Sequence, residues 1–382
     1  MPRTLGPFAL ALALGVLGGC TPDAPVPSVS ARLPAPAPLP GSSIPLRHGI
    51  NVGNRLDAPT EGEWGSTLDE TLFEAIAVAG FDHVRIPIRF NAHAAAAAPY
   101  AIDEAFFRRV DWAVDQVEHH RMTAIIDFHH YNELMEDPAA HADRFVGLWR
   151  QIAARYRGRG PTVYYELLNE PNGKLTAEAW NAILARALRE VRAVDPGRKV
   201  IIDSYFWAAA KELATTLALP AGDANLIGSF HMYQPILFTH QGAPWMTPEF
   251  QTPGVLFPGP PPAPIAPLPA AQKVSWVAGW FRKYNTLPAA ENPSGPTTIA
   301  EEFEYVRQFT AKTGLPVYLG EFGAIDKADP ASRVAWTRMV RQEAEKRGIP
   351  WTYWDDAGSF KLYDPKARTW NADLMGALFQ PR

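Results

Sequence analysis

The stretches YYELLNEP (residues 164–171) and PVYLGEFG (residues 316–323) decide how this chain folds. Each is an apolar run of strand length with a glutamate near its C-terminal end, Glu170 in the first and Glu321 in the second. Continuous apolar runs are typical of strands that are buried on both faces of a parallel sheet. If both strands belong to one parallel barrel, their C-terminal ends lie on the same face, and the two carboxylates meet there.

Runs of the same kind recur along the chain and alternate with amphipathic stretches. Eight strands are predicted, at His48–Val52, His83–Ile88, Met122–Phe128, Val163–Leu168, Val200–Tyr205, Leu226–His231, Val317–Glu321 and Trp351–Trp354. Helices are predicted between them at Leu68–Ala79, Glu104–His119, Ala142–Tyr156, Ala177–Val194, Ile299–Thr313 and Ala331–Lys346. This alternation predicts the α/β class, as a (β/α)8 TIM barrel with a single catalytic domain. A doubly wound dinucleotide-binding sheet is disfavoured, because the sequence has no Gly-x-Gly-x-x-Gly run or phosphate loop.

The composition is that of a globular protein without a highly charged partner. The chain has 382 residues, of which 47% are hydrophobic, and its net charge is only −4. A nucleic-acid partner is therefore not expected, since the sequence shows no basic stripe. The twelve tryptophans are a high number. Most of them are expected in the core, and the others are expected as flat stacking platforms. We expect a monomer that needs no cofactor.

Residues 1–20 resemble a signal peptide of the bacterial lipoprotein type. Arg3 precedes the apolar run Phe8–Leu17, which is too short to span a bilayer and has the length of a secretory h-region. The single cysteine, Cys20, follows this run, and in such signals the cysteine becomes the lipidated N-terminus. Thr21 after it points to the outer membrane. We expect a secreted protein of the cell envelope with an outer-membrane lipid anchor at Cys20. The alternative is a plain secretory signal that is cut nearby.

Two further segments interrupt the regular pattern. Residues 21–45 are rich in Pro, Ala and Ser without apolar periodicity, which predicts an extended linker. The catalytic domain is expected at 46–382. Within it, an insertion at about 235–298 contains the tract PGPPPAP (residues 258–264). Because it follows the sixth strand, we expect it on the catalytic face, where it can wall a substrate groove, with the proline tract as a stiff surface segment.

Polar or aromatic residues stand at the C-terminal ends of the predicted strands. In chain order they are Asn51, Arg85, His129, His130, Asn169, Glu170, His231, Tyr233, Glu321 and Trp354. In a parallel α/β barrel, residues at this end of the strands point into the active site. Each residue alone is weak support, because a charged strand end is commonly just solvated and a histidine there commonly has a structural hydrogen bond. Together they follow the strand ends in order, which argues for a shared site.

The motifs LNEP (residues 168–171) and GEFG (residues 320–323) resemble those of glycoside hydrolase family 5, retaining β-glycanases that include many cellulases. The resemblance covers nearly all of the chain from residue 46 onward. It implies that Glu170 is the general acid/base and that Glu321 is the nucleophile. It implies a supporting and substrate-binding set that comprises Arg85, His129, Asn169, His231, Tyr233 and Trp354. Asn51 and His130 are expected as additional substrate contacts.

Elementary electrostatics gives the two glutamates different roles. Two carboxylates about 5 Å apart at an effective dielectric of about 20 repel by roughly 3 kcal/mol, which is about 2 pKa units. One of the two acids therefore holds a proton at a pH at which the other is ionised. A guanidinium beside Glu321 keeps that carboxylate charged, so the proton is expected on Glu170. Such a pair, about 5–5.5 Å apart, implies hydrolysis with retention of configuration.

Within this family the resemblance implies an endo-1,4-β-glucanase that acts on a β-glucan. Mixed-linkage β-glucanase, mannanase and xyloglucanase are alternatives on the same frame. From a different class, a non-catalytic glycan-binding lipoprotein is disfavoured, because a binding protein has no need of both glutamates. A catalytic metal is not expected, because the adjacent His129 and His130 would diverge on a strand.

Overall fold

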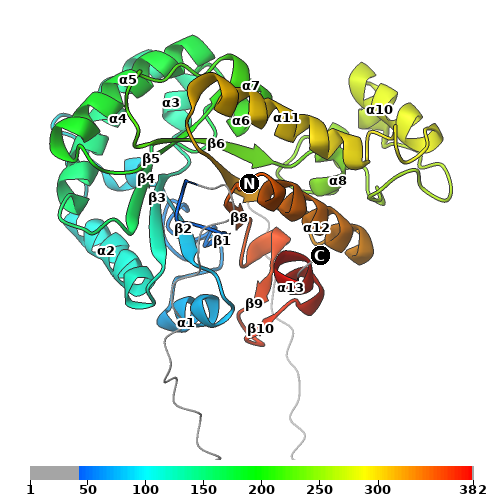
Figure 1. Cartoon of the computed structure of the whole chain (residues 1–382), viewed down its shortest axis with the longest axis horizontal. Helices are drawn as coiled ribbons and strands as arrows, with labels where there is room; N and C mark the ends of the chain where they lie inside the picture. Colours follow the sequence, from blue (N-terminus) through cyan, green and yellow to red (C-terminus); the bar gives the residue numbers. More distant parts are fainter. Residues whose placement is uncertain (1–42, 381–382) are drawn as a thin grey trace, which may run out of the picture. The chain divides into compact units, whose positions relative to one another are not determined.

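The computed structural model describes residues 43–380 of the chain, and in this part eight parallel strands close into a barrel in the order β1 to β8 (Figure 1). The strands are β1 His48–Asn51, β2 His83–Ile88, β3 Thr123–Phe128, β4 Val163–Glu166, β5 Val200–Asp203, β6 Leu226–Met232, β7 Val317–Phe322 and β8 Trp351–Tyr353. Strand β1 pairs with both β2 and β8, which closes the ring. The predicted (β/α)8 TIM barrel is therefore confirmed.

The helices between the strands surround the barrel (Figure 1). They are α1 Glu70–Val78, η1 Phe90–His93, α2 Glu104–His119, α3 Asn132–Glu136, α4 Pro138–Tyr156, α5 Ala177–Val194, α6 Tyr205–Ala208, α7 Ala210–Thr215, α8 Ile236–Thr239, η2 Pro248–Phe250, α9 Pro269–Gln272, α10 Ser275–Thr286, α11 Pro296–Thr313, α12 Pro330–Lys346, η3 Gly358–Phe360 and α13 Ala372–Phe379. A short hairpin of β9 Tyr363–Asp364 and β10 Thr369–Trp370 precedes α13.

Helix α4 begins four residues before its predicted start. The Asp137 side chain accepts a hydrogen bond from the backbone N–H of Ala140, which satisfies one of the free donors of the first turn. Pro138 follows at the first helical position, where its missing N–H costs nothing. The apolar periodicity that the sequence shows starts only after this cap, which is why the prediction began late.

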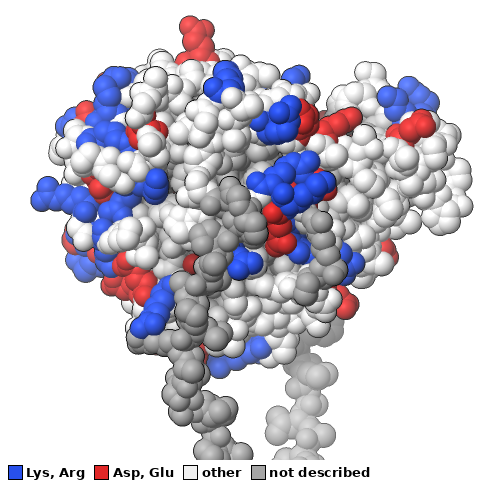
Figure 2. Space-filling model, in the orientation of Figure 1, with Lys and Arg blue, Asp and Glu red and all other residues white. Residues whose placement is uncertain are grey.

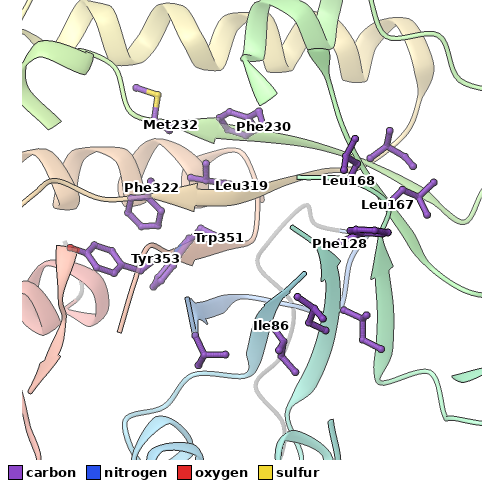
Figure 3. Packing of buried hydrophobic residues seen from close by; sticks show 14 of the residues in the cluster. Ile86, Phe128, Leu167, Leu168, Phe230, Met232, Leu319, Phe322, Trp351 and Tyr353 are labelled. Carbon is purple, nitrogen blue, oxygen red and sulfur yellow. The ribbon is translucent and has the colours of Figure 1, made fainter. Parts of the chain in front are cut away.

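Two separate apolar regions hold the barrel together. The larger one lies between the strands and the helices and includes the outward-facing Phe128, Phe230 and Trp351, which Figure 3 shows on three different strands. The smaller one, which we call the plug, consists of Ile44, Leu46, Ile125, Tyr164, Ile201, Ile227 and Tyr318. Ile44 is buried in the plug, so packing into the barrel already starts within the stretch that the sequence assigned to the linker at 21–45.

The insertion at about 235–298 contains α8, η2, α9 and α10. Helix α10 lies away from the ring of strands, at the right of Figure 1. The prolines at 258, 260, 262 and 264 are exposed. The buried Gly259 donates its N–H to the carbonyl of Ser294, and a Cβ there would stand 2.5 Å from Oδ1 of Asn292. Only glycine permits this approach, which ties the proline tract to the segment before α11.

Charge is spread thinly over the surface. On the face drawn in Figure 2, basic and acidic side chains are interspersed among large neutral areas. None of the helices within residues 43–380 is long and apolar enough to cross a membrane. The predicted signal peptide and Cys20 lie outside the described residues.

Candidate active site

Glu321 lies near the end of β7 and is 4% exposed. Its Oε1 accepts a hydrogen bond of 2.7 Å from Nη1 of Arg85, and its Oε2 accepts one of 2.8 Å from the hydroxyl of Tyr233. Both donors stabilise the charged form of the carboxylate and fix its orientation. The guanidinium that the sequence analysis expects beside Glu321 is therefore that of Arg85.

The glycines of the GEFG motif make room for this arrangement. A Cβ on Gly320 would stand 2.9 Å from Nε2 of His231. A Cβ on Gly323 would stand 2.2 Å from the carbonyl oxygen of Trp354. The motif therefore surrounds its glutamate with backbone that a histidine and a tryptophan can approach closely.

Glu170 follows β4 in a left-handed backbone conformation, with φ of 50°. Its Oε1 lies 2.8 Å from Nδ1 of His231, and its backbone N–H donates to Oδ2 of Asp203 at 3.0 Å. A carboxylate oxygen of Glu170, one of Glu321 and a ring nitrogen of His231 all lie within 4.8 Å of one another. The fold thus brings together Glu170, which follows β4, and Glu321, which lies on β7.

Arg85 is the centre of the network beneath the two acids. It is fully buried and forms a bidentate pair with Glu166, at 2.8 and 2.7 Å. Its remaining donors reach Asn51, Asn169 and Glu321, and Nη2 lies 3.1 Å from Asp127. Because each of its nitrogens is used by the protein, Arg85 does not face the site as the substrate contact that was predicted.

Asn51 is also fully buried, and its predicted role as a substrate contact is not supported by its position. Its amide nitrogen donates to the carbonyls of Gly320 and Tyr353, at 3.0 and 3.2 Å. Its oxygen accepts from Arg85. These three bonds link β1 to β2, β7 and β8, so Asn51 stabilises the barrel under the site.

The protons of the site are distributed differently from the sequence expectation. Burial acts to lower the pKa of His231, but the charges of Glu321 and Asp203 and the bond to Glu170 outweigh it and raise the pKa to about 9. Burial acts to raise the pKa of Glu170, but the hydrogen bond and charge of His231 lower it overall. Burial raises the pKa of Glu321, against the charges of His231 and Arg85. In the free site the proton therefore lies on His231 rather than on Glu170.

Asp203, at the end of β5, is a site residue that the sequence analysis missed. It is fully buried, and its Oδ2 lies 3.6 Å from Nε2 of His231 while it accepts the N–H of Glu170. One carboxylate thus orients both the backbone of Glu170 and the imidazole that bonds its side chain. Burial raises the pKa of Asp203 to about 6, although the charge of His231 opposes the shift. The available signal was its place at the C-terminal end of a predicted strand.

His129 and His130 converge instead of diverging, so the argument that excluded a shared ion was wrong. His130 has φ of 48°, outside the strand conformation, and the two ring centroids are 4.4 Å apart. Nδ1 of His129 lies 2.5 Å from Oδ2 of Asp127. Burial lowers the pKa of His130 to about 4 and also lowers that of His129. Both rings are therefore neutral at pH 7.

Aromatic rings border the acids. Trp354 stacks on His129 with a centroid distance of 5.6 Å and an angle of 4° between planes. A Cβ on Gly53 would stand 2.7 Å from the ring of Trp354, so this glycine allows the ring to lie against the loop that follows β1. The backbone N–H of the exposed Trp207 donates to the carbonyl of Pro171. The rings of two other exposed tryptophans contact residues of the site: Trp64 contacts His130, and Trp245 contacts His240, which packs on Tyr233. These rings offer flat apolar faces around the carboxylates.

The chain is similar to known proteins of one family. The family described as cellulase (glycosyl hydrolase family 5) matches residues 48–358. Endoglucanase H of Acetivibrio thermocellus is 30% identical over 339 residues, which cover 87% of this chain and 33% of that protein. Endoglucanase 3 of Fibrobacter succinogenes is 26% identical and covers 84% of this chain and 50% of that protein. The chain therefore spans between a third and a half of the length of these relatives.

Solved structures match over almost their whole length. The endoglucanase Cel5A of Thermotoga maritima is 39% identical with a TM-score of 0.75, over 87% of this chain and 97% of that one. The clostridial cellulose synthase subunit Z of Clostridioides difficile is 30% identical with a TM-score of 0.75, over 88% of this chain and all of that one. In both cases the shared part includes the barrel that carries the two glutamates.

Proposed function

This chain belongs to glycosyl hydrolase family 5 and is a glycoside hydrolase, and from that premise we propose that it is an endo-1,4-β-glucanase that retains configuration. The observation that carries the proposal is the approach of Glu170 and Glu321, since one carboxylate oxygen of each lies within 4.8 Å of one of the other. A separation of about 5–5.5 Å suits a retaining enzyme, whereas an inverting one needs about 6.5–9.5 Å to admit a water. A glycan-binding protein without activity is no longer an alternative.

In the proposed reaction, Glu321 attacks the anomeric carbon and forms a glycosyl ester, while the bond to the leaving oxygen breaks. Arg85 and Tyr233 hold the attacking carboxylate in place, because Arg85 donates to Oε1 of Glu321 and Tyr233 donates to Oε2. The leaving oxygen takes a proton from Glu170. A water then loses its proton to Glu170 and attacks the same carbon, which releases Glu321 and gives the product with its original configuration.

In this scheme His231 supplies the proton through its hydrogen bond to Glu170. In the free enzyme the proton lies on Nδ1 of His231, 2.8 Å from Glu170. As the leaving oxygen gains negative charge, His231 passes this proton to Oε1 of Glu170, and Glu170 gives it to the leaving oxygen, which leaves His231 neutral and Glu170 a carboxylate. The proton that Glu170 later takes from water returns to His231. Asp203 faces the other ring nitrogen at 3.6 Å and stabilises the charged imidazole.

Substrate contacts are proposed for the residues that remain accessible above Arg85. Asn169 uses its oxygen on Arg85, so its amide N–H groups are free to bond the sugar 2-OH. Trp354 and the exposed Trp64 and Trp245 offer stacking faces beside residues of the site. Platforms spread in this way suit a chain of sugar rings rather than one ring.

The test of the substrate is a panel of carboxymethyl-cellulose, barley β-glucan, mannan and xyloglucan, with Glu170→Gln and Glu321→Gln as matched inactive controls. We expect the highest kcat/KM on the 1,4-β-glucans and a rapid fall in viscosity, which marks internal cleavage. Mannan is the second candidate, because Cel5A of T. maritima has been solved with mannotriose as well as with cellobiose. Activity on mannan alone would overturn the glucanase assignment.

Retention is tested by proton NMR of the first product formed. The β anomer should appear first and mutarotate afterwards. Initial formation of the α anomer contradicts a double displacement at Glu321, whichever polysaccharide is cleaved.

Anchoring in the outer membrane through Cys20 is a separate proposal that rests on the sequence of residues 1–20. Cys20→Ser should move the protein from the membrane fraction to the soluble fraction, and metabolic labelling with a fatty acid should disappear. Thr21→Ser is a conservative control at the next position. An unchanged distribution of Cys20→Ser would rule out lipidation.

A further inference from the structure

A second group of side chains converges beside the catalytic acids. Asp57, His129 and His130 each offer one ligand atom, and these three atoms lie within 4.8 Å of one another. His130 Nε2 is 3.8 Å from Oδ2 of Asp57. The proposed hydrolysis assigns no role to Asp57, although the residue is only 1% exposed. The proposed hydrolysis therefore does not explain why this buried carboxylate faces two imidazoles.

We propose that Asp57, His129 and His130 bind a divalent transition-metal ion, such as Zn²⁺ or Cu²⁺, and that the bound ion blocks the sugar groove. The second half of this proposal rests on the proposed function, whereas the first half concerns ion binding alone.

The carboxylate of this group is fixed in position before any ligand arrives. Oδ1 of Asp57 accepts the backbone N–H of Arg55 at 2.7 Å, and Oδ2 accepts that of Asn54 at 3.1 Å. Asn54 itself has φ of 63°, which turns the loop after β1 so that both N–H groups point at one side chain. A carboxylate oxygen has more than one acceptor direction, so Oδ2 can still approach an ion.

His129 has the arrangement that is usual for histidine ligands. Its Nδ1 is paired with Asp127 at 2.5 Å, which orients the ring and leaves Nε2 as the nitrogen available to an ion. Metal-binding histidines commonly pair their second nitrogen with a carboxylate, which raises the basicity of the ligand. Asp127 is held in turn by Arg85 at 3.1 Å.

The ligand set decides which ions fit. Two imidazoles and one carboxylate favour Zn²⁺, Cu²⁺ or Ni²⁺, whereas Mg²⁺ and Ca²⁺ prefer sets made of oxygen atoms. Three protein ligands leave a coordination position open to water, as in other accessible zinc sites. The side chain of His130 is 36% exposed, so an ion can reach the group from solvent.

The position of the group explains why a bound ion would block sugar. His129 stacks on Trp354, and His130 contacts the exposed Trp64 at a centroid distance of 5.6 Å. An ion held between the two histidines therefore occupies space between two of the proposed stacking platforms. Inhibition should be competitive, with a higher KM and an unchanged kcat.

The first experiment measures ion binding without substrate, by isothermal titration of the purified enzyme with ZnCl₂ and CuCl₂ at pH 7, with MgCl₂ alongside. The variants are Asp57→Asn, whose single side-chain oxygen keeps the bond to the backbone N–H of Arg55 but whose amide nitrogen cannot accept that of Asn54, and His130→Gln. The matched control is His119→Gln, because His119 and His120 form another histidine pair, 5.1 Å apart, at the end of α2. We expect Zn²⁺ affinity to fall about tenfold or more in both variants and to stay unchanged in the control.

The second experiment measures hydrolysis of the glucan at several Zn²⁺ concentrations. A rise in KM that chelation reverses supports blocking of the groove. Equal Zn²⁺ affinity in wild type, Asp57→Asn and His130→Gln would overturn the ion site. Loss of kcat at constant KM would overturn the blocking. Absence of hydrolysis on every glucan would count against the proposed function and leave the titration result valid.

Discussion

The plug and the layer above it are built on the same inward face of the same strands, yet one is apolar and the other is charged. Along β3, Ile125 belongs to the plug and Asp127 to the charged layer, and along β5 the corresponding pair is Ile201 and Asp203. Residues two apart on a strand point to the same side. Two residues further toward the C-terminal end of these strands, the inward-facing side chains therefore change from apolar residues of the plug to charged residues of the site.

The two layers differ in what they contribute to the free energy of the fold. The plug removes apolar surface from water and needs no partner for its atoms beyond close contact, apart from the hydroxyls of its tyrosines. The charged layer places several carboxylates around Arg85 and His231, at a desolvation cost that the ion pairs offset only in part. Replacing a plug residue should therefore lower stability, and replacing a charged residue should lower the rate.

The largest effect is expected for Glu321→Gln. Loss of the nucleophile should lower kcat on the order of 10⁵-fold, because no other group replaces the covalent step. The melting temperature should stay equal or rise, since one buried charge disappears. Steady-state kinetics and thermal unfolding of the same sample check this. A clear loss of stability would contradict the expectation that residues of the charged layer contribute to the rate and not to stability.

The next effect is expected for His231→Gln. Losing the proton donor of Glu170 should lower kcat roughly 10²–10³-fold. Because the pKa of His231 is about 9, wild-type activity should fall as the pH rises through about 9, when this proton is lost. In the variant that alkaline limb should move, since the bond and charge that lower the pKa of Glu170 are removed. A pH profile of kcat identical to the wild type would contradict the proton path.

For the plug, Ile201→Ala should lower the free energy of unfolding by about 2–5 kcal/mol, as deletion of a fully buried aliphatic side chain does. Its kcat should stay within about twofold of the wild type at temperatures where it is folded, because Ile201 does not contact the acids. Ile201→Val is the matched smaller deletion and should cost about 0.5–1.5 kcal/mol. Chemical denaturation gives both values. A large loss of kcat in folded Ile201→Val would contradict the separation of the layers.

The smallest effect is expected for Asp203→Asn, about tenfold in kcat, which corresponds to about 1.4 kcal/mol. The amide oxygen can still accept the N–H of Glu170, so the backbone is held while the negative charge beside His231 is lost. The pKa of His231 should therefore fall and the alkaline limb should shift to lower pH. A merely structural role would change stability without moving that limb.

The barrel could be predicted because its strands are buried on both faces. The apolar runs at His83–Ile88 and Val317–Phe322 differ clearly from the amphipathic pattern of the helices. Each of the eight predicted strands starts and ends within two residues of the observed strand. The two glutamates could be placed for the same reason, as each follows such a run. The (β/α)8 class thus followed from hydrophobic pattern alone.

The finer organisation of the site could not be predicted in this way. Whether the proton lies on Glu170 or on His231 depends on a 2.8 Å contact between residues 61 positions apart. The convergence of His129 and His130 depends on one backbone angle that histidine seldom adopts. Asp203 could have been noticed at its strand end, but its two partners are visible only in three dimensions.

The hydrogen bonds of Arg85 have a consequence for how the barrel assembles from its halves. Its partners Asn51, Asp127, Glu166 and Asn169 all come from the segment up to residue 169, and of its described partners only Glu321 comes from the segment beyond it. The first half-barrel can therefore neutralise its buried arginine by itself. The bond of Glu321 to Arg85 and the bonds of His231 and Asp203 to Glu170 form only when the second half closes against it. During folding, enzymatic activity should thus be the last signal to appear, and it reports closure of the two halves rather than completion of either one.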